Sequence, residues 1–161
     1  MSENRITVTT KEVANEQLLP EIIRLIEEGH TVTLPLKGYS MRPFLENARD
    51  KALLAKPQGI EVGDPVLAEI SPGRYVLHRI IGIRGDSVTL RGDGNLSNEY
   101  CTLADVKAKA TAFFRKGRTK PDYTSSLKWR AYSWIWLRLF PIRRYLLAFY
   151  RRIWLKLFKP I

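Results

Sequence analysis

A serine and a histidine of this sequence have the chemical character of a nucleophile and its base. Ser40 lies between Gly38 and Pro43, a setting that predicts a tight turn with an exposed hydroxyl after an apolar run. His78, one of only two histidines, lies in a later apolar run. Because a neutral imidazole accepts a hydroxyl proton near pH 7, this pair predicts nucleophilic catalysis by serine.

An acidic residue that could orient His78 follows it in the sequence. Asp93 lies fifteen residues after His78, in the turn of residues 92–95. A carboxylate bonded to the second ring nitrogen fixes the tautomer of a catalytic histidine and stabilises its charged form. Asp93 is therefore the first candidate for the orienting acid.

These residues belong to four motifs that occur in a fixed order. They are Gly-Tyr-Ser-Met-Arg-Pro (38–43), Gly-Asp-Pro-Val-Leu (63–67), His-Arg-Ile-Ile (78–81) and Gly-Asp-Gly-Asn (92–95). Over residues 30–114 the sequence thereby resembles the signal peptidase I-like serine peptidases, and within them the branch that uses histidine as the base. The resemblance implies a small antiparallel β domain and a serine endopeptidase that needs no cofactor or metal. It also implies a peptide or preprotein substrate that carries a leader or is associated with a membrane.

The resemblance further implies roles for two neighbours of Ser40. Met41 is expected to line the substrate groove, and the backbone N–H of Ser40 is expected to stabilise the oxyanion. The family often supplies a second oxyanion contact from a hydroxyl two residues before the serine. Gly38 occupies that position here and has no hydroxyl to offer.

The histidine branch of the family also carries a second acid six residues after the first. Glu99 occupies that position here and is the alternative orienting acid, so the choice between Asp93 and Glu99 is open.

The elements that must position these residues follow from turn residues and hydrophobic spacing. Apolar residues at helical spacing predict a helix over about 12–28. Short β-prone runs separated by Pro, Gly and Asp predict a mainly β, antiparallel core over about 30–114, and with the helix they make a peptidase-like domain of residues 1–114. The runs cover residues 31–36, 51–56, 65–70, 74–83, 87–91 and 106–114.

Beyond the β-prone runs the composition changes. Residues 115–126 are polar and contain Gly117 and Pro121, which predicts a linker. Residues 127–161 predict a helical tail, with helices over 127–139 and 142–158 divided at Pro141. Residues 1–114 are nearly neutral, so the net charge of +11 comes from residues 115–161; the tail alone holds nine Lys and Arg, no Asp or Glu, and all four tryptophans.

A basic and aromatic amphipathic tail is typical of a membrane interface. One apolar face collects Ile142, Tyr145, Leu146, Phe149, Ile153 and Leu157. Eight strongly apolar residues favour insertion of residues 131–150 by about 2 to 5 kcal/mol, whereas Arg138, Arg143 and Arg144 each cost about 2.5 to 3.5 kcal/mol. The tail is therefore expected to lie on an anionic membrane surface as a peripheral or monotopic anchor, without spanning the bilayer.

Other interpretations remain for the tail and for the whole chain. The tail is alternatively a helical hairpin packed on the domain, and a nucleic-acid-binding tail is less favoured. No apolar segment resembles a cleaved signal peptide near Met1, so the catalytic domain is expected to be cytoplasmic. Cys101 is the only cysteine, which argues against a disulfide or a zinc centre. Oligomeric state is not predicted.

Two rival functions are weighed against the peptidase. The first is a catalytically inactive peptidase-fold adaptor that binds membrane or nucleic acid through its basic tail, which a large separation of Ser40 and His78 would favour. The second is a self-cleaving repressor of the same superfamily. The residues before Ser40 predict one helix and no helix-turn-helix, and that relative uses a lysine base, so the repressor is disfavoured.

Overall fold

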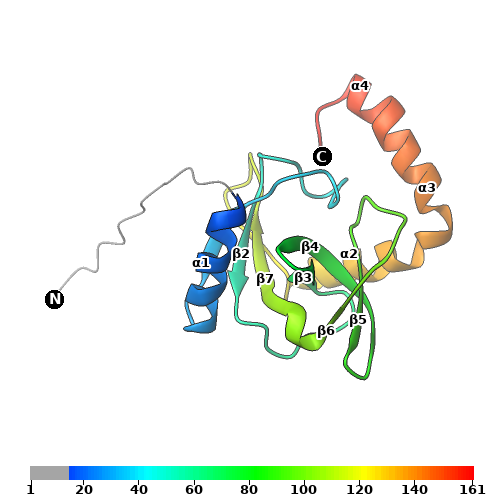
Figure 1. The fold of residues 1–161 in the computed structure, drawn as a ribbon. Helices are drawn as coiled ribbons and strands as arrows, with labels where there is room; N and C mark the ends of the chain where they lie inside the picture. Colours follow the sequence, from blue (N-terminus) through cyan, green and yellow to red (C-terminus); the bar gives the residue numbers. More distant parts are fainter. Residues whose placement is uncertain (1–14) are drawn as a thin grey trace.

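The computed structural model describes residues 15–161, in which a β sheet is preceded by one helix and followed by a helical region (Figure 1). The first helix, α1 (Asn15–Glu27), buries Ile22, Ile23 and Ile26 and contacts β1 and β7. It is followed by Gly29 with a φ of 96°, a conformation that ends helices. The predicted start of this helix, residues 12–14, lies outside the described residues.

Within residues 15–161, eight strands form one antiparallel sheet. Their order is β1-β2-β7-β3-β4-β5-β6, and β8 pairs with the end of β7. The strands are β1 (Val32–Pro35), β2 (Lys51–Ala55), β3 (Pro65–Ser71), β4 (Arg74–Arg84), β5 (Ser87–Arg91), β6 (Glu99–Thr102), β7 (Val106–Phe114) and β8 (Asp122–Tyr123). The predicted fold class is confirmed: the protein is mainly antiparallel β, with an N-terminal helix and a helical C-terminal region.

The sheet separates two clusters of buried apolar side chains. Along β3, Leu67 belongs to the first cluster, which also contains Phe113 and the buried isoleucines of α1. Val66 and Ala68 belong to the second cluster, together with Ile80 of β4. This division follows from the alternation of side chains along a strand, which sends neighbours to opposite faces.

All six predicted β-prone runs form strands, with ends that differ by at most one residue. Strands β6 and β8 were not predicted. The sequence of β6, Glu-Tyr-Cys-Thr, lacks an apolar alternation because β6 is an edge strand that pairs only with β5 and stays half exposed.

The two ends of the segment 115–126 are integrated into the β domain, in contrast to the predicted linker, whereas residues 116–120 form an exposed loop. Arg115 and Thr124 are buried, and β8 pairs with β7. The hydroxyl of Thr124 donates to the carbonyl oxygens of Ala110 (3.0 Å) and Thr111 (3.1 Å). The composition predicted a linker because the segment is polar. A strand of two residues and one buried threonine hydroxyl do not produce a recognisable pattern in such a sequence.

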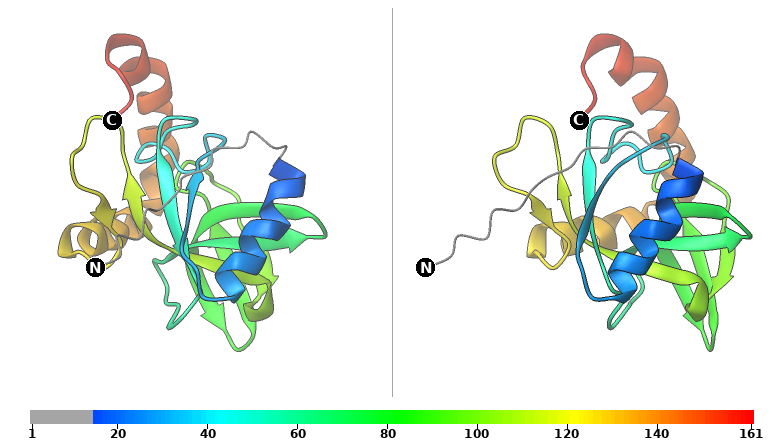
Figure 2. Two further views of the ribbon diagram at one scale, coloured as in Figure 1. Left: turned by 90° about the vertical axis from the view of Figure 1, so that its left-hand side faces the viewer. Right: turned by 60° about the vertical axis from the view of Figure 1, so that its left-hand side comes forward.

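The tail is helical, as predicted. It consists of α2 (Leu127–Arg138), α3 (Phe140–Phe149), a π-helical turn (Tyr150–Trp154) and α4 (Leu155–Leu157). The first break falls at Leu139 rather than at Pro141, which lies in the first turn of α3, where the missing N–H has no helical acceptor to lose. Figures 1 and 2 show α3 and α4 as one rod that extends away from the sheet before the chain turns back.

Helix α2 packs on the β domain, which corresponds to the alternative of a packed tail. Trp129 stacks on Phe113 of β7 with ring centres 4.9 Å apart, and Tyr132 stacks on Phe44 at 3.6 Å. Ser126 caps the helix by accepting a hydrogen bond from the N–H of Trp129 at 3.2 Å. These aromatic contacts join α2 both to the sheet and to the loop that carries Ser40.

Candidate active site

Ser40 lies on a loop that is fixed on both sides of it. Gly38, with a φ of 86°, turns the chain after β1, and its N–H donates to Oδ1 of Asn47 at 2.8 Å. Met41 and Leu45 are buried in the core, whereas Ser40 itself is half-buried. The loop therefore holds the serine at the surface of a pocket while its neighbours anchor the backbone.

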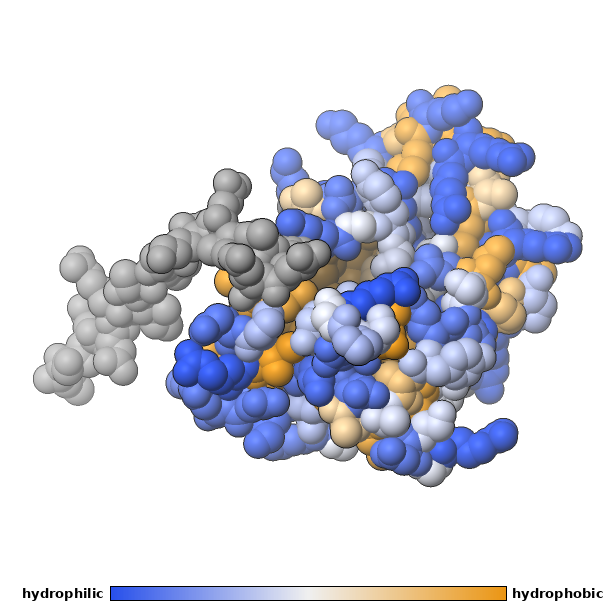
Figure 3. All heavy atoms as spheres, viewed as in Figure 1, coloured by the Kyte–Doolittle hydropathy of each residue, from blue (hydrophilic) through white to orange (hydrophobic). Residues whose placement is uncertain are grey.

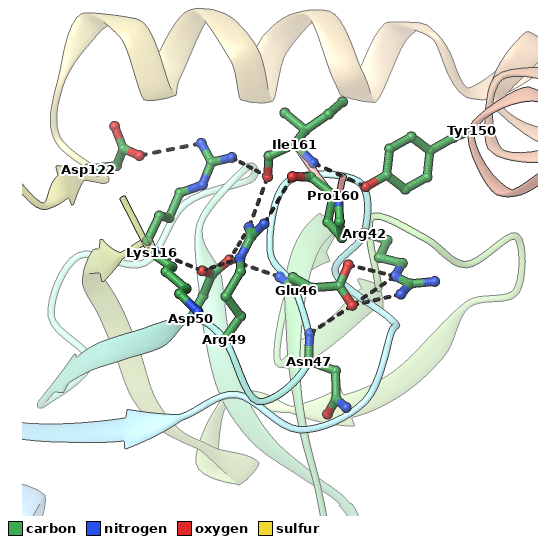
Figure 4. Close-up of polar contacts among 11 residues, drawn as sticks. Arg42, Glu46, Asn47, Arg49, Asp50, Lys116, Asp122, Tyr150, Pro160 and Ile161 are labelled. Atoms are coloured by element: carbon green, nitrogen blue, oxygen red, sulfur yellow. Dashed lines mark hydrogen bonds and ion pairs between the residues drawn. The ribbon is translucent and has the colours of Figure 1, made fainter. Parts of the chain in front are cut away.

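Charged side chains reinforce the end of this loop (Figure 4). Arg42 donates two short hydrogen bonds to the carboxylate of Glu46, at 2.9 and 2.7 Å. Asp50 accepts from the N–H of Glu46 (2.9 Å) and from Arg49 (2.7 Å). Burial raises the pKa of Asp50, but the hydrogen bonds from Arg49 and the backbone outweigh it, so the pKa is lowered and the carboxylate stays charged.

The turn of residues 92–95 lies directly against the Ser40 loop. The N–H of Gly94 donates to the carbonyl oxygen of Ser40 at 2.7 Å. A Cβ on Gly92 would collide with that oxygen and would lie 3.1 Å from Nε2 of His78. A Cβ on Gly94 would lie 2.9 Å from the carbonyl oxygen of Tyr39. Only glycine at these two positions lets the loop, the turn and the histidine approach one another this closely.

His78 is nearly fully buried on β4, where it lies opposite Val66 of β3. Ser40 and His78 line the same pocket, and Nε2 of His78 faces the serine loop across Gly92. Within the described residues the Ser40 hydroxyl makes no hydrogen bond to Nε2; in empty active sites such bonds are often long and tighten only with substrate. The structure thus brings the predicted nucleophile and base to one site.

The carboxylate that contacts His78 is that of Glu99. Nδ1 of His78 lies 2.5 Å from Oε2 of Glu99, although the approach is not in line with a hydrogen bond, so the contact is mainly electrostatic. Burial lowers the pKa of His78 below its ordinary value of 6.5, and Glu99 opposes this shift without cancelling it. The imidazole is therefore neutral at pH 7, as a general base must be.

Asp93, the first candidate for the orienting acid, is engaged elsewhere. Its carboxylate accepts two hydrogen bonds from Arg79, at 2.8 and 2.7 Å, and one from the hydroxyl of Tyr132 at 3.0 Å. Both members of this ion pair are about 1% exposed. These partners occupy the Asp93 carboxylate, so of the two candidate acids it is Glu99 that contacts Nδ1 of His78 within the described residues.

The C-terminal helices contribute to the site, which the sequence did not indicate. Besides Tyr132, the indole N–H of Trp136 donates to the carbonyl oxygen of Asp93 at 3.1 Å. Arg151 donates to the carbonyl oxygen of Gly94 at 2.8 Å. Burial and the charge of Asp93 raise the pKa of Tyr132 well above its usual range, so its hydroxyl remains a donor. The turn beneath Ser40 is thus held from the sheet side and from the tail.

The pocket beside Ser40 and His78 has a volume of about 220 Å³ and a mainly apolar lining. Gly38 and Met41, the predicted groove residues, both line it. Its other apolar walls are Leu19, Leu34, Leu36, Leu67, Tyr75 and Leu77. An apolar cavity of about 150 Å³ is enough to bind benzene, so this pocket is large enough for one apolar side chain.

Other chemistry has less support in the described residues. Among residues 15–161, no cluster of three or more His, Cys, Asp or Glu is placed to hold a metal ion. Burial raises the pKa of Cys101 to about 11, so this thiol is protonated near neutral pH and is a poor nucleophile. None of the helices in this part of the chain has both the length and the apolar character needed to cross a membrane.

Comparison with known proteins adds no family assignment. No protein-family model matches the sequence, and the curated proteins include no significant match. The resemblance to signal peptidase I-like enzymes therefore depends on the four motifs and on the geometry described above.

Proposed function

We propose that this protein is a serine endopeptidase in which Ser40 is the nucleophile, His78 the general base and Glu99 the orienting carboxylate. The observation that supports this most directly is the placement of His78: one ring nitrogen faces the Ser40 loop across Gly92, and the other contacts Glu99. A buried histidine with a lowered pKa between a serine and a carboxylate is the arrangement of a catalytic base rather than of a packed core residue.

In the proposed reaction the Ser40 oxygen bonds to the carbonyl carbon of a peptide while its proton passes to Nε2 of His78. The imidazolium then gives this proton to the amine as the peptide C–N bond breaks, leaving an acyl group on Ser40. Water releases the acyl group by the same two proton transfers. Glu99 stabilises the imidazolium at Nδ1 in both halves of the reaction.

The developing oxyanion needs donors near Ser40. The N–H of Gly38 is already bonded to Asn47, and glycine has no side-chain hydroxyl. Gly38 therefore supplies no donor to the oxyanion. The N–H of Ser40 donates to no other group within residues 15–161, which makes it the candidate donor.

A peptide is the substrate that the surroundings of the site fit best. Among residues 15–161, strand β1 pairs with β2 along one side, and no strand pairs with its other edge next to the pocket. An extended peptide adds to such an edge by main-chain hydrogen bonds and places alternate side chains in neighbouring pockets. The mainly apolar pocket then favours an apolar side chain next to the cleaved bond.

Covalent labelling tests the proposal without knowledge of the natural substrate. A fluorophosphonate probe should modify the protein at Ser40, as mapped by peptide mass spectrometry, because only an activated serine reacts readily. Ser40→Ala and His78→Ala should abolish labelling, whereas the matched variant Ser97→Ala, at an exposed serine near the site, should label normally. Labelling that is equal in wild type and Ser40→Ala would exclude the proposed nucleophile.

One observation favours the alternative of a catalytically inactive adaptor with a peptidase fold. The Ser40 hydroxyl is not bonded to His78 within the described residues, which is also the state of a site that has lost its function. The same labelling experiment separates the two: an inactive scaffold leaves Ser40 unmodified even at high probe concentration.

A further inference from the structure

The rod consists of α3, the π-helical turn and α4. Along α3 and the π-helical turn it has a row of exposed apolar side chains, here called the outer face. These residues are between 36% and 60% exposed. They are Ile142, Tyr145, Leu146, Phe149 and Ile153. Their spacing of three and four residues places them on one side of the helix. Figure 3 shows apolar surface along this rod, interrupted by hydrophilic side chains.

The opposite side of the same rod is packed, which fixes the direction of the outer face. Arg143, Leu147 and Tyr150 are buried, and Arg143 donates to the carbonyl oxygen of Trp136 at 2.5 Å. Arg151 reaches Gly94 of the β domain. Because these contacts already fill the inner side, rotation of the helix cannot bury the outer face. A contiguous apolar surface of this kind marks an interaction site.

The charges around the outer face indicate its partner. Residues 127–161 contain nine Lys and Arg and no Asp or Glu. Arg144, Arg152 and Lys156 are exposed on the rod itself, Phe158 is exposed at its far end, and Trp134 is exposed on α2. An apolar face bordered by cations and aromatic rings fits the boundary of an anionic bilayer, where the apolar side chains enter the acyl region and the cations meet the headgroups.

We propose that the outer face of α3 and the π-helical turn binds the surface of an anionic lipid bilayer, with the rod lying along the membrane plane. This proposal does not require peptidase activity. It has a consequence for the site if that activity exists: Arg151 bonds to Gly94, whose N–H bonds to Ser40, so the rod holds the serine loop at a fixed position relative to the bilayer.

Vesicle flotation with the full chain tests the apolar part of the proposal. The protein should float with vesicles of phosphatidylcholine and phosphatidylserine, and Ile142→Ser/Phe149→Ser should weaken this binding by about tenfold or more, since two large apolar side chains lose their burial. The matched variant Val62→Ser/Tyr100→Ser removes exposed apolar side chains (52% and 63% exposed) from the β domain and should float like wild type. Equal flotation of all three proteins would overturn the proposal.

Vesicle composition tests the electrostatic part. Binding to phosphatidylcholine alone should be weaker than to mixed vesicles, and raised salt should reduce the difference. Arg144→Gln/Arg152→Gln should lose most of the preference for phosphatidylserine, whereas Arg118→Gln/Lys120→Gln, exposed in the β domain, should keep it. A preference that survives the first pair and disappears with the second would move the membrane contact away from the rod.

Two further results would contradict a lipid partner. If wild type does not float but sediments as a dimer that Ile142→Ser/Phe149→Ser converts to a monomer, the outer face binds a second copy of the chain. If it does not float but binds oligonucleotides through Arg144 and Arg152, the basic residues serve nucleic acid. Circular dichroism of each variant confirms that the fold is intact before either result is interpreted.

Discussion

Two neighbouring residues of β4 pair with acids on opposite faces of the sheet, and the pairs differ in almost every property. Arg79 and Asp93 are fully buried, and the carboxylate is bonded on both oxygens. His78 contacts Glu99 with a geometry that is close but not in line, and Glu99 is partly exposed. The first pair is saturated and can only stabilise structure. The second has an unfilled hydrogen-bonding capacity beside a pocket, which is what acid–base chemistry requires.

The same contrast separates the two helical parts of the tail. Helix α2 stacks Trp129 on Phe113 of the sheet, and its Tyr132 and Trp136 donate hydrogen bonds to Asp93 in the turn of residues 92–95. Helix α3 has an apolar face that is left exposed by the described part of the chain, residues 15–161. The tail is therefore both a scaffold for the site and, by our proposal, a membrane contact, and neither sequence interpretation of the tail was complete.

The comparison of the two pairs predicts a large loss of activity for Glu99→Gln. Removal of the charge at Nδ1 should lower kcat by about 10³- to 10⁴-fold, as expected for neutralising a triad acid. Its stability should change by less than about 1 kcal/mol, because the contact is partly exposed. The measurement is kcat on a peptide found by library screening, with Glu69→Gln, an acid on β3, as the control. A kcat within tenfold of wild type would remove Glu99 from the mechanism.

Asp93→Asn should have the opposite profile. Neutralising one partner leaves the Arg79 guanidinium buried without its counter-charge, which costs about 3 to 5 kcal/mol of unfolding free energy. Urea denaturation of Asp93→Asn and Glu99→Gln under the same conditions gives the ranking. A stable Asp93→Asn protein that has lost kcat by several orders of magnitude would return the orienting role to Asp93.

The sequence was sufficient for six of the eight strands described and for placing Ser40 and His78 at one site, but not for the acid that contacts His78. Glycine and proline turns divide the chain so clearly that the runs were located correctly, and Ser40 and His78 were found from their motifs. One signal for the acids was present and unused: strand alternation sends the side chains of His78 and Arg79 to opposite faces, so the two residues cannot share one carboxylate. Glu99 was harder to assign because it begins β6, an edge strand without an apolar pattern.

The packing of α2 could not have been predicted from its composition. Trp129, Trp136 and the exposed Trp134 look alike in sequence, and basic residues surround all three. Only the position of α2 against Phe113 and Phe44 decides which of them is buried. Aromatic residues occur both in packed cores and at membrane interfaces, so composition alone does not distinguish a packed helix from a membrane-bound one.

A smaller effect tests the contribution of the tail to the saturated pair. Tyr132→Phe removes one hydrogen bond to Asp93 but leaves both bonds from Arg79, so unfolding should become easier by about 0.5 to 1.5 kcal/mol. Tyr145→Phe, which changes an exposed tyrosine of the outer face, should have no measurable effect in the same urea titration. If both variants are equally stable, the tail hydroxyl does not support the turn.

The free energy of unfolding should depend on pH through the lowered pKa of His78. Because burial places the folded pKa below the unfolded value of 6.5, the unfolded chain binds this proton more readily than the folded protein. The stabilisation is therefore complete above pH 6.5 and is lost as the pH falls from 6.5 through the folded pKa. His78→Gln should abolish this part of the pH dependence when urea midpoints are compared between pH 7.5 and pH 5.

The same shift sets the acid limb of the activity profile. A general base acts only when it is neutral, so kcat/KM should fall with a midpoint below pH 6.5. Glu99 opposes the lowering of the His78 pKa, so the residual activity of Glu99→Gln should have its midpoint at still lower pH. A wild-type midpoint above 6.5 that moves down in Glu99→Gln would show that the carboxylate outweighs burial at Nδ1. The contact between His78 and Glu99 would then be stabilised mainly by charge, as the pair of Arg79 and Asp93 is.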